Sequence, residues 1–242
     1  MLRSSQNLPV HLATLRARMA AAAASAGRNV DSVTLLAVAK GQPAQLIRAA
    51  AAAGVTDIGE SYLIEALGKM ETLGDLPLTW HFIGRLQANK TRPVAEHFAW
   101  VHGVDRLKLA ERLSTQRPYH APPLNLCIQV NLAGEASKGG VPPEEAPALA
   151  AAVAALPRLA LRGLMCIPPE ETDPGRQREW FARLRALRDS LNAGGLSLDT
   201  LSMGMSGDFE AAIQEGATLV RIGTALFGPR PQAPAPGTIR ES

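Results

Sequence analysis

The sequence predicts a single (β/α)8 TIM-like barrel with an extra N-terminal helix, an α/β fold indicated by three observations. Short apolar runs alternate eight times with longer, alanine-rich amphipathic segments. The runs are almost continuously apolar, which is typical of parallel strands covered on both faces. The chain has 242 residues, close to the ~250 residues typical of such barrels. A doubly wound open sheet is the alternative, but eight strands in a chain of this length favour a closed barrel.

The elements are expected in the following order. An alanine-rich helix comes first, from about Pro9 to Gly27, because a glycine often ends a helix. Apolar runs bounded by Gly, Pro and polar residues predict strands at 33–40, 55–61, 78–84, 100–104, 124–132, 159–167, 200–206 and 219–227. Amphipathic stretches predict helices at 43–53, 62–73, 86–97, 106–116, 143–156, 176–191 and 208–215. We expect one domain over residues 1–230 and a disordered tail, rich in Pro, Ala and Gly, over residues 231–242.

Composition and charge argue against several classes of protein. The N-terminus lacks the apolar segment of a secretion signal, and no uninterrupted apolar stretch approaches ~20 residues, so we expect a cytoplasmic protein without membrane contact. Basic residues number 25 against 22 acidic ones and are scattered along the chain, which argues against nucleic-acid binding. The five histidines and two cysteines lack the spacing of metal ligands, so no metal is expected. Cys127 and Cys166 lie in apolar runs and are expected to be buried free thiols.

The chemistry of the chain is expected where the predicted strands end. In such barrels the site is built from the carboxyl ends of the strands, and phosphate groups favour the loops after strands seven and eight. Lys40, one of only five lysines, closes the first strand, where burial can lower the pKa of an amine and make it nucleophilic. Ser206 and Gly223-Thr224 lie at or near the carboxyl ends of the last two strands. Together they predict a Schiff base at one edge of a site and a phosphate-binding loop at the other.

Arg221, the segment 206–208 and His81 are further candidates for the site, and each also has a structural interpretation. Arg221 lies between Val220 and Ile222, so it must either point inward with a partner or disrupt the strand. An inward Arg221 is well placed to contact the ring nitrogen of a heteroaromatic group. The segment 206–208 is suited to cap the following helix, whose free N–H groups also suit a phosphate. His81 is as compatible with a satisfied core histidine as with a ligand.

The sequence around these residues resembles the pyridoxal phosphate homeostasis protein family, and the resemblance extends over almost the whole chain. The matches are 36–40, 58–62, 80–90, 129–131 with Glu135 and 138–139, 163–165, 201–213 and 220–228. The resemblance implies a barrel like the N-terminal domain of alanine racemase, with pyridoxal phosphate held as an aldimine on Lys40. It further implies that the cofactor is bound by Ser61, His81, Asn131, Met205, Ser206, Arg221, Gly223 and Thr224. Within this set, Ser206, Gly223 and Thr224 would hold the phosphate, and Arg221 would face the pyridine nitrogen.

The chain departs from the family pattern at two places. The family usually has Asn where Ser61 stands, and Ser-Lys-Thr where Ala39, Lys40 and Gly41 stand. Serine is shorter than asparagine, so a contact with the cofactor ring at position 61 is expected to be lost or mediated by water.

Three functions are compatible with these residues. The leading hypothesis is a monomeric protein that holds pyridoxal phosphate without catalysis and passes it to recipient enzymes. The second is an amino-acid racemase or isomerase using Lys40, and the third is an aldolase that needs no cofactor. An arginine beside the ring nitrogen weakens the cofactor as an electron sink. A base opposite Lys40 is also not evident, since Tyr119 precedes the fifth strand and Tyr62 opens a helix. Both points favour the carrier.

Overall fold

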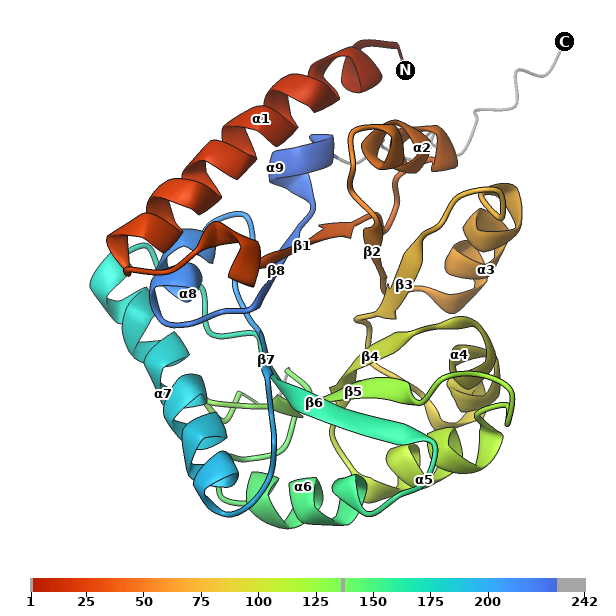
Figure 1. The fold of residues 1–242 in the computed structure, drawn as a ribbon, viewed down its shortest axis with the longest axis vertical. Coiled ribbons are helices and arrows are strands. Elements are labelled where there is room, and N and C mark those ends of the chain that lie inside the picture. The colour runs from red at the N-terminus through yellow and green to blue at the C-terminus, as the bar shows by residue number, and fades with distance from the viewer. Residues whose placement is uncertain (1, 136–137, 230–242) are drawn as a thin grey trace, which may run out of the picture.

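The computed structural model describes residues 2–135 and 138–229; the predicted tail at 231–242 lies outside them. Its eight parallel strands form a closed barrel in sequential order, with the helices outside it (Figure 1). The strands are β1 Thr34–Val38, β2 Asp57–Glu60, β3 Thr79–Phe82, β4 Trp100–Val104, β5 Leu124–Val130, β6 Leu159–Cys166, β7 Thr200–Ser202 and β8 Leu219–Ile222. The barrel closes where β1 pairs with β8, with Leu36 opposite Arg221. The predicted fold class is confirmed.

The helices largely follow the predicted alternation. They are α1 Leu2–Ser25, α2 Ala44–Ala52, α3 Leu63–Thr72, α4 Thr91–His97, α5 Leu107–Gln116, α6 Ala146–Ala154, α7 Pro174–Ala193, α8 Phe209–Gln214 and α9 Thr224–Phe227, with short 3-10 turns at Val30–Ser32 and Ala88–Lys90. The additional N-terminal helix, α1, starts before the predicted residue and contains Pro9. It packs against α2, α8 and α9, on the side where β8 meets β1 (Figure 1). There the Nδ1 atom of His11 lies 3.1 Å from the carbonyl oxygen of Leu226.

Two predicted strands were too long, at the expected phosphate-binding segments. The strand predicted at 200–206 ends at Ser202, because the chain turns at Gly204, whose φ is +92° and where a Cβ would lie 2.6 Å from that of Ala212. The strand predicted at 219–227 ends at Ile222, and the residues after Gly223 form the short helix α9 instead. Both segments therefore leave the sheet at the mouth of the barrel, the first as a loop and the second as a short helix.

The inside of the barrel differs from the layer between strands and helices. That outer layer is apolar and contains Ile47, Ile58, Phe98 and Leu113 among its fully buried side chains. Within the barrel the strands bury polar side chains, namely His81, His102, Ser202 and Arg221. Because burial of an unsatisfied polar group is costly, these groups must bond to one another.

The two cysteines agree with the sequence prediction. Cys127 and Cys166 are buried and unbonded, and burial raises the pKa of each thiol to about 12. Both are therefore protonated at neutral pH and are poor nucleophiles.

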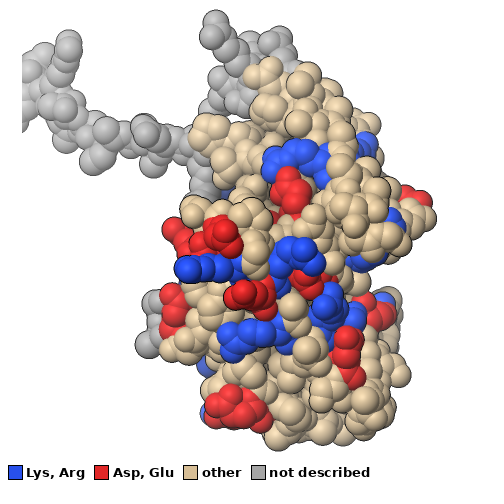
Figure 2. Space-filling model, turned by 90° about the vertical axis from the view of Figure 1, so that its left-hand side faces the viewer, with Lys and Arg blue, Asp and Glu red and all other residues tan. Residues whose placement is uncertain are grey.

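Charges of both signs mix on the surface formed by α1, α7 and α8 (Figure 2). Arg18 pairs with Glu210 there, while Arg178 and Arg185 share Glu215. This face therefore lacks the continuous basic stripe of a nucleic-acid-binding surface. In the described part of the chain, no helix combines the length and apolarity needed to cross a membrane.

Candidate cofactor-binding site

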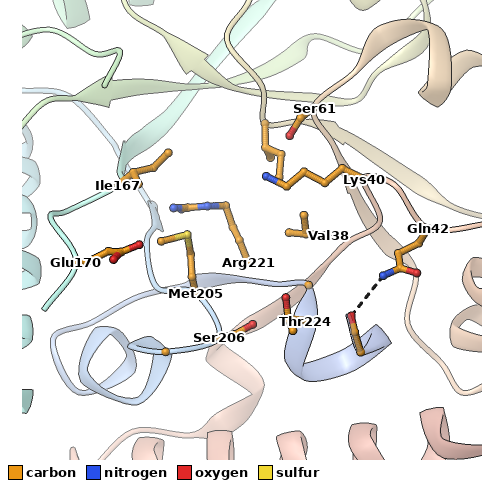
Figure 3. A pocket seen from close by; sticks show the side chains of 14 residues that line it. Val38, Lys40, Gln42, Ser61, Ile167, Glu170, Met205, Ser206, Arg221 and Thr224 are labelled. Carbon is orange, nitrogen blue, oxygen red and sulfur yellow. Dashed lines mark hydrogen bonds between the residues drawn. The ribbon is translucent and has the colours of Figure 1, made fainter. Parts of the chain in front are cut away.

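A cavity of about 490 Å³ opens at the carboxyl ends of the strands, within the range of ~300–1,000 Å³ typical of small-molecule sites. Seven predicted residues line it: Lys40, Ser61, Met205, Ser206, Arg221, Gly223 and Thr224. Figure 3 shows the Lys40 amine and the Arg221 guanidinium reaching into the space, with Ser206 and Thr224 on the side of the last two loops. A lysine amine, a guanidinium and hydroxyl groups thus face one cavity, although the strands that carry them are far apart in sequence.

Lys40 occupies a tight turn directly after β1. The Gln42 amide donates to the Ala39 carbonyl at 2.9 Å, and Gly41 adopts a φ of +70°, as the third residue of a type II turn requires. This turn places Lys40 at the mouth of the barrel, where its side chain is half-buried. The position agrees with the prediction from the end of the apolar run.

A buried cluster of charges holds this turn from outside the barrel. The Lys69 amine donates to the Ala39 carbonyl at 2.7 Å and to Glu60 at 2.6 Å, and it also pairs with Glu65 at 2.5 Å. Glu65 accepts the amide of Gly41 at 2.6 Å. Burial raises the pKa of Glu60, and its hydrogen bond from Lys69 opposes that shift. The cluster was missed in the sequence, although Glu65 and Lys69 have the i, i+4 spacing of a helical ion pair.

Arg221 points inward from β8, as predicted, and is bound by main-chain and side-chain oxygens. Its NH1 group donates to the carbonyl of Ser202 at 2.6 Å and to the Ser202 hydroxyl at 3.0 Å, and its NH2 group donates to the Cys166 carbonyl at 2.9 Å. Among the described residues no carboxylate lies within 4.0 Å of it as an ion-pair partner. A guanidinium has five N–H groups, so donors remain for an acceptor in the cavity.

The loops after β7 and β8 meet at the other side of the cavity. The Ser206 hydroxyl accepts the amide of Ala225 at 3.3 Å, which leaves its own proton available to another acceptor. Asp208 was expected in the first turn of α8 but precedes the helix, where its carboxylate accepts the amide of Met205 at 2.6 Å. Burial raises the pKa of Asp208, and the Met205 bond opposes that rise.

His81 and Asn131 do not line this cavity. His81 lies deeper in the barrel and also lines a pocket of about 320 Å³ with Asp57 and Trp100. The Asn131 amide instead braces the loop after β5, donating to the carbonyls of Glu135 at 2.9 Å and Lys138 at 3.3 Å. Of the predicted binding residues, these two are therefore not brought to the cavity.

The cavity also includes residues that the sequence analysis did not single out. Ile167 and Glu170 follow β6, and Gln42 donates to the Gly228 carbonyl at 3.4 Å (Figure 3). Gln42 thereby links the turn of Lys40 to the end of α9. Its place between Gly41 and Pro43, directly after the first predicted strand, was the available signal, whereas Glu170 carried none.

Comparisons with known proteins decide the family. The model of the alanine racemase N-terminal domain family matches residues 10–231. The pyridoxal phosphate homeostasis protein of Pseudomonas aeruginosa is 62% identical over 220 residues, which cover 91% of this chain and 94% of that protein. This chain belongs to the pyridoxal phosphate homeostasis protein family. The Escherichia coli K12 member is 50% identical over 223 residues, covering 91% of this chain and 95% of that protein. The resemblance stated from the sequence is confirmed.

Solved structures agree with this family. The structure of PipY from Synechococcus elongatus PCC7942 with PLP bound matches this chain with a TM-score of 0.81 and 39% sequence identity. The match covers 91% of this chain and 100% of PipY. An alanine racemase from Clostridium difficile 630 shares the fold at 15% identity and a TM-score of 0.73, covering 94% of this chain but 58% of the racemase.

The two departures from the family pattern lie around Lys40. Gly41 has the positive φ given above, which glycine adopts without strain. Ser61 lines the cavity beside Lys40, so its hydroxyl faces the space that the usual asparagine of the family would enter.

Proposed function

We propose that this protein holds pyridoxal phosphate covalently on Lys40 and releases it to recipient enzymes, without catalysing a reaction of its own. The observation that carries this proposal is the single cavity that brings together Lys40, Arg221 and Ser206. Each group suits one part of the cofactor: the amine its aldehyde, the guanidinium its pyridine nitrogen, and the hydroxyl with the Gly223-Thr224 main chain its phosphate. The PLP-bound structure of PipY supports the assignment.

A second cavity adjoins the first at Lys40, which suits a protein that exchanges its ligand. Lys40 and Ser61 also line a neighbouring cavity of about 600 Å³, together with Tyr62, Arg85 and Lys90. An amine that faces two open spaces can be approached by water or by a competing amine. A buried catalytic site, by contrast, excludes water.

Catalysis by the same lysine is the second candidate, favoured by the shared fold with alanine racemase. Pyridoxal phosphate supplies an electron sink, which is strongest when its ring nitrogen is protonated. Arg221 donates hydrogen bonds and does not release its proton at neutral pH, so it would keep that nitrogen an acceptor. Tyr62 is 60% exposed and faces the neighbouring cavity, and Tyr119, at 90% exposed, precedes β5. Neither supports a base opposite Lys40.

Visible spectroscopy tests the proposal directly. Addition of pyridoxal phosphate to the purified chain should produce an absorption band of a lysine-bound cofactor, which borohydride removes. A protein that shows no such band with pyridoxal phosphate, but forms a reducible adduct with a carbonyl substrate, would instead be a cofactor-independent aldolase.

Deuterium exchange distinguishes the carrier from the racemase. The loaded wild-type protein should exchange the α-hydrogen of alanine or serine in D2O no faster than free pyridoxal phosphate does. Arg221→Glu should exchange faster, because a carboxylate favours a protonated pyridine nitrogen. Arg221→Gln, which also removes the positive charge, is the companion variant, and circular dichroism confirms that each is folded. Rapid exchange by the wild type would establish the enzyme instead.

Replacement of Ser206 by alanine should weaken pyridoxal phosphate binding by about 10- to 100-fold, the equivalent of roughly 1.5–3 kcal/mol for a hydrogen bond to a charged group. The affinity for pyridoxal, which lacks the phosphate, should remain unchanged in the same variant. Ser190→Ala, at an exposed position on α7, serves as the control. An equal loss for both ligands would place the phosphate elsewhere.

A further inference from the structure

A continuous chain of hydrogen bonds runs through the inside of the barrel, from Arg221 to its amino-terminal end. Arg221 donates to the Ser202 hydroxyl at 3.0 Å, and that hydroxyl lies 2.8 Å from Nδ1 of His102. Nε2 of His102 lies 2.9 Å from Nδ1 of His81. Nε2 of His81 lies 3.1 Å from Oδ1 of Asp57. Side chains from β7, β4 and β3 thus connect Arg221 on β8 to Asp57, the first residue of β2.

When both imidazoles are neutral, the two ends of this series of hydrogen bonds determine the direction of every bond in it. An arginine only donates, and an ionised carboxylate only accepts. Burial acts to raise the pKa of Asp57, but the bonds from His81 and Thr56 outweigh it and the pKa is lowered. His81 therefore donates through Nε2 and accepts at Nδ1. His102 then donates through Nε2 and accepts the Ser202 proton at Nδ1.

In this arrangement both histidines are neutral and protonated on Nε2. A second proton on His102 would reverse its bond to the Ser202 hydroxyl, which would then accept from both His102 and Arg221, and a second proton on His81 would reverse the bond between the two rings. Burial supports the neutral form, since it lowers the pKa of His81 and, more strongly, that of His102. Stacking also fixes the orientation of the His81 ring, because its centroid lies 5.4 Å from that of the Trp100 ring and the two ring planes are within 5° of parallel.

This direction matters for the charge on Arg221. The side chain is buried, and uncompensated burial of a cation is costly. Each O–H and N–H bond in the chain directs its proton towards Asp57 and the lone pair of its heavy atom towards Arg221. The dipoles therefore present their negative ends to the guanidinium and connect it to a carboxylate whose side chain is 27% exposed.

We infer that His81, His102 and Ser202 are positioning residues for Arg221, with Asp57 as its remote counter-charge. They stabilise the protonated guanidinium and leave its remaining donors directed at the cavity. The effect on ligand binding rests on the proposed function, in which Arg221 contacts pyridoxal phosphate. The hydrogen-bond arrangement itself does not depend on that function.

Nitrogen-15 NMR of the full chain, without added cofactor, tests the arrangement. Long-range proton–nitrogen correlation spectra, assigned with His81→Gln and His102→Gln variants, should show both rings as neutral Nε2–H tautomers from about pH 6 to 8, around the ordinary histidine pKa of ~6.5. A ring in the Nδ1–H form, or one that titrates in this interval, would overturn the inference.

A charge-removing variant tests the link to Arg221. Asp57→Asn keeps an oxygen that can accept from His81 but removes the negative charge. It should weaken pyridoxal phosphate binding roughly 2- to 30-fold. Asp199→Asn is the matched control. Asp199 lines the same pocket as Asp57, at the amino-terminal end of the barrel, but it pairs with Arg162 and takes no part in the hydrogen bonds that lead to Arg221. Equal effects of the two variants would contradict the inference.

A double-mutant cycle separates coupling along the chain from general destabilisation. Ser202→Ala breaks the chain next to Arg221, so adding Asp57→Asn to it should produce little further loss of affinity. Fully additive losses would show that Asp57 does not act through the chain. If the wild type binds no pyridoxal phosphate, the proposed function fails, whereas the NMR result still decides the arrangement.

Discussion

Replacing Lys40 with alanine is expected to abolish the borohydride-fixed pyridoxal phosphate adduct. Among the described residues, Lys40 is the lysine that lines the candidate cavity, so we expect it to react there with the aldehyde of a cofactor whose phosphate lies at Ser206. The variant should retain weaker, non-covalent binding, since Arg221 and the phosphate loops are unchanged. Peptide mapping by mass spectrometry after reduction measures the result.

Lys138→Ala is the matched control for this experiment. Lys138 lies in the loop after β5. In the structure its amine donates to the Pro168 carbonyl at 2.8 Å and pairs with Glu135 at 2.6 Å. The variant should retain the full adduct on the peptide that contains Lys40. An undiminished adduct in the Lys40 variant would refute the assignment.

Replacing Lys69 with methionine should reduce the free energy of unfolding by about 3–5 kcal/mol, because it leaves the buried carboxylate of Glu60 without its partner. For a chain of this size the melting temperature should fall by roughly 10 °C. The loss should also move the Lys40 turn, since the same amine binds the Ala39 carbonyl. Thermal and urea unfolding followed by circular dichroism measure the change, with Lys108→Met on the exposed side of α5 as the control.

The pH dependence of this variant has a definite sign. Burial already raises the folded-state pKa of Glu60 above its ordinary value, and removal of the Lys69 cation raises it further. A group whose folded pKa exceeds its unfolded pKa disfavours folding when it is ionised and ceases to do so once it is protonated. The deficit relative to the wild type should therefore shrink as the pH falls towards and below the folded pKa of Glu60. A deficit independent of pH would exclude this cause.

The sequence was a good guide to which residues face inward, but not to their depth in the barrel. Alternation along a strand distinguishes inside from outside, which is why Arg221 was correctly expected to point inward. The level along the barrel axis depends on strand register and tilt, which no single strand contains. His81 pairs in register with Gly59 and Trp100, and its side chain lies inside the barrel, below the cavity.

Strand ends were the other weak point, since apolar composition continues past the last ladder bond. Met203 and Leu226 are buried and extend the apolar runs, yet they belong to a loop and to α9. The signals were Gly204 and Gly223, the residues around which the chain turns. The Lys69 cluster was missed because its members occur on a strand and the following helix, and only the folded chain brings them to the Ala39 carbonyl.

The pairing of β1 with β8 has a consequence for the order of events during translation. Lys40 emerges from the ribosome early, whereas Arg221 and the Gly223-Thr224 loop are among the last described residues to be made. A nascent chain that ends before β8 contains the reactive amine but none of the groups on that strand and loop. It would meet the aldehyde as an ordinary solvent-exposed lysine does. With the proposed function, selective capture of the cofactor therefore requires the last strand, which closes the barrel against β1.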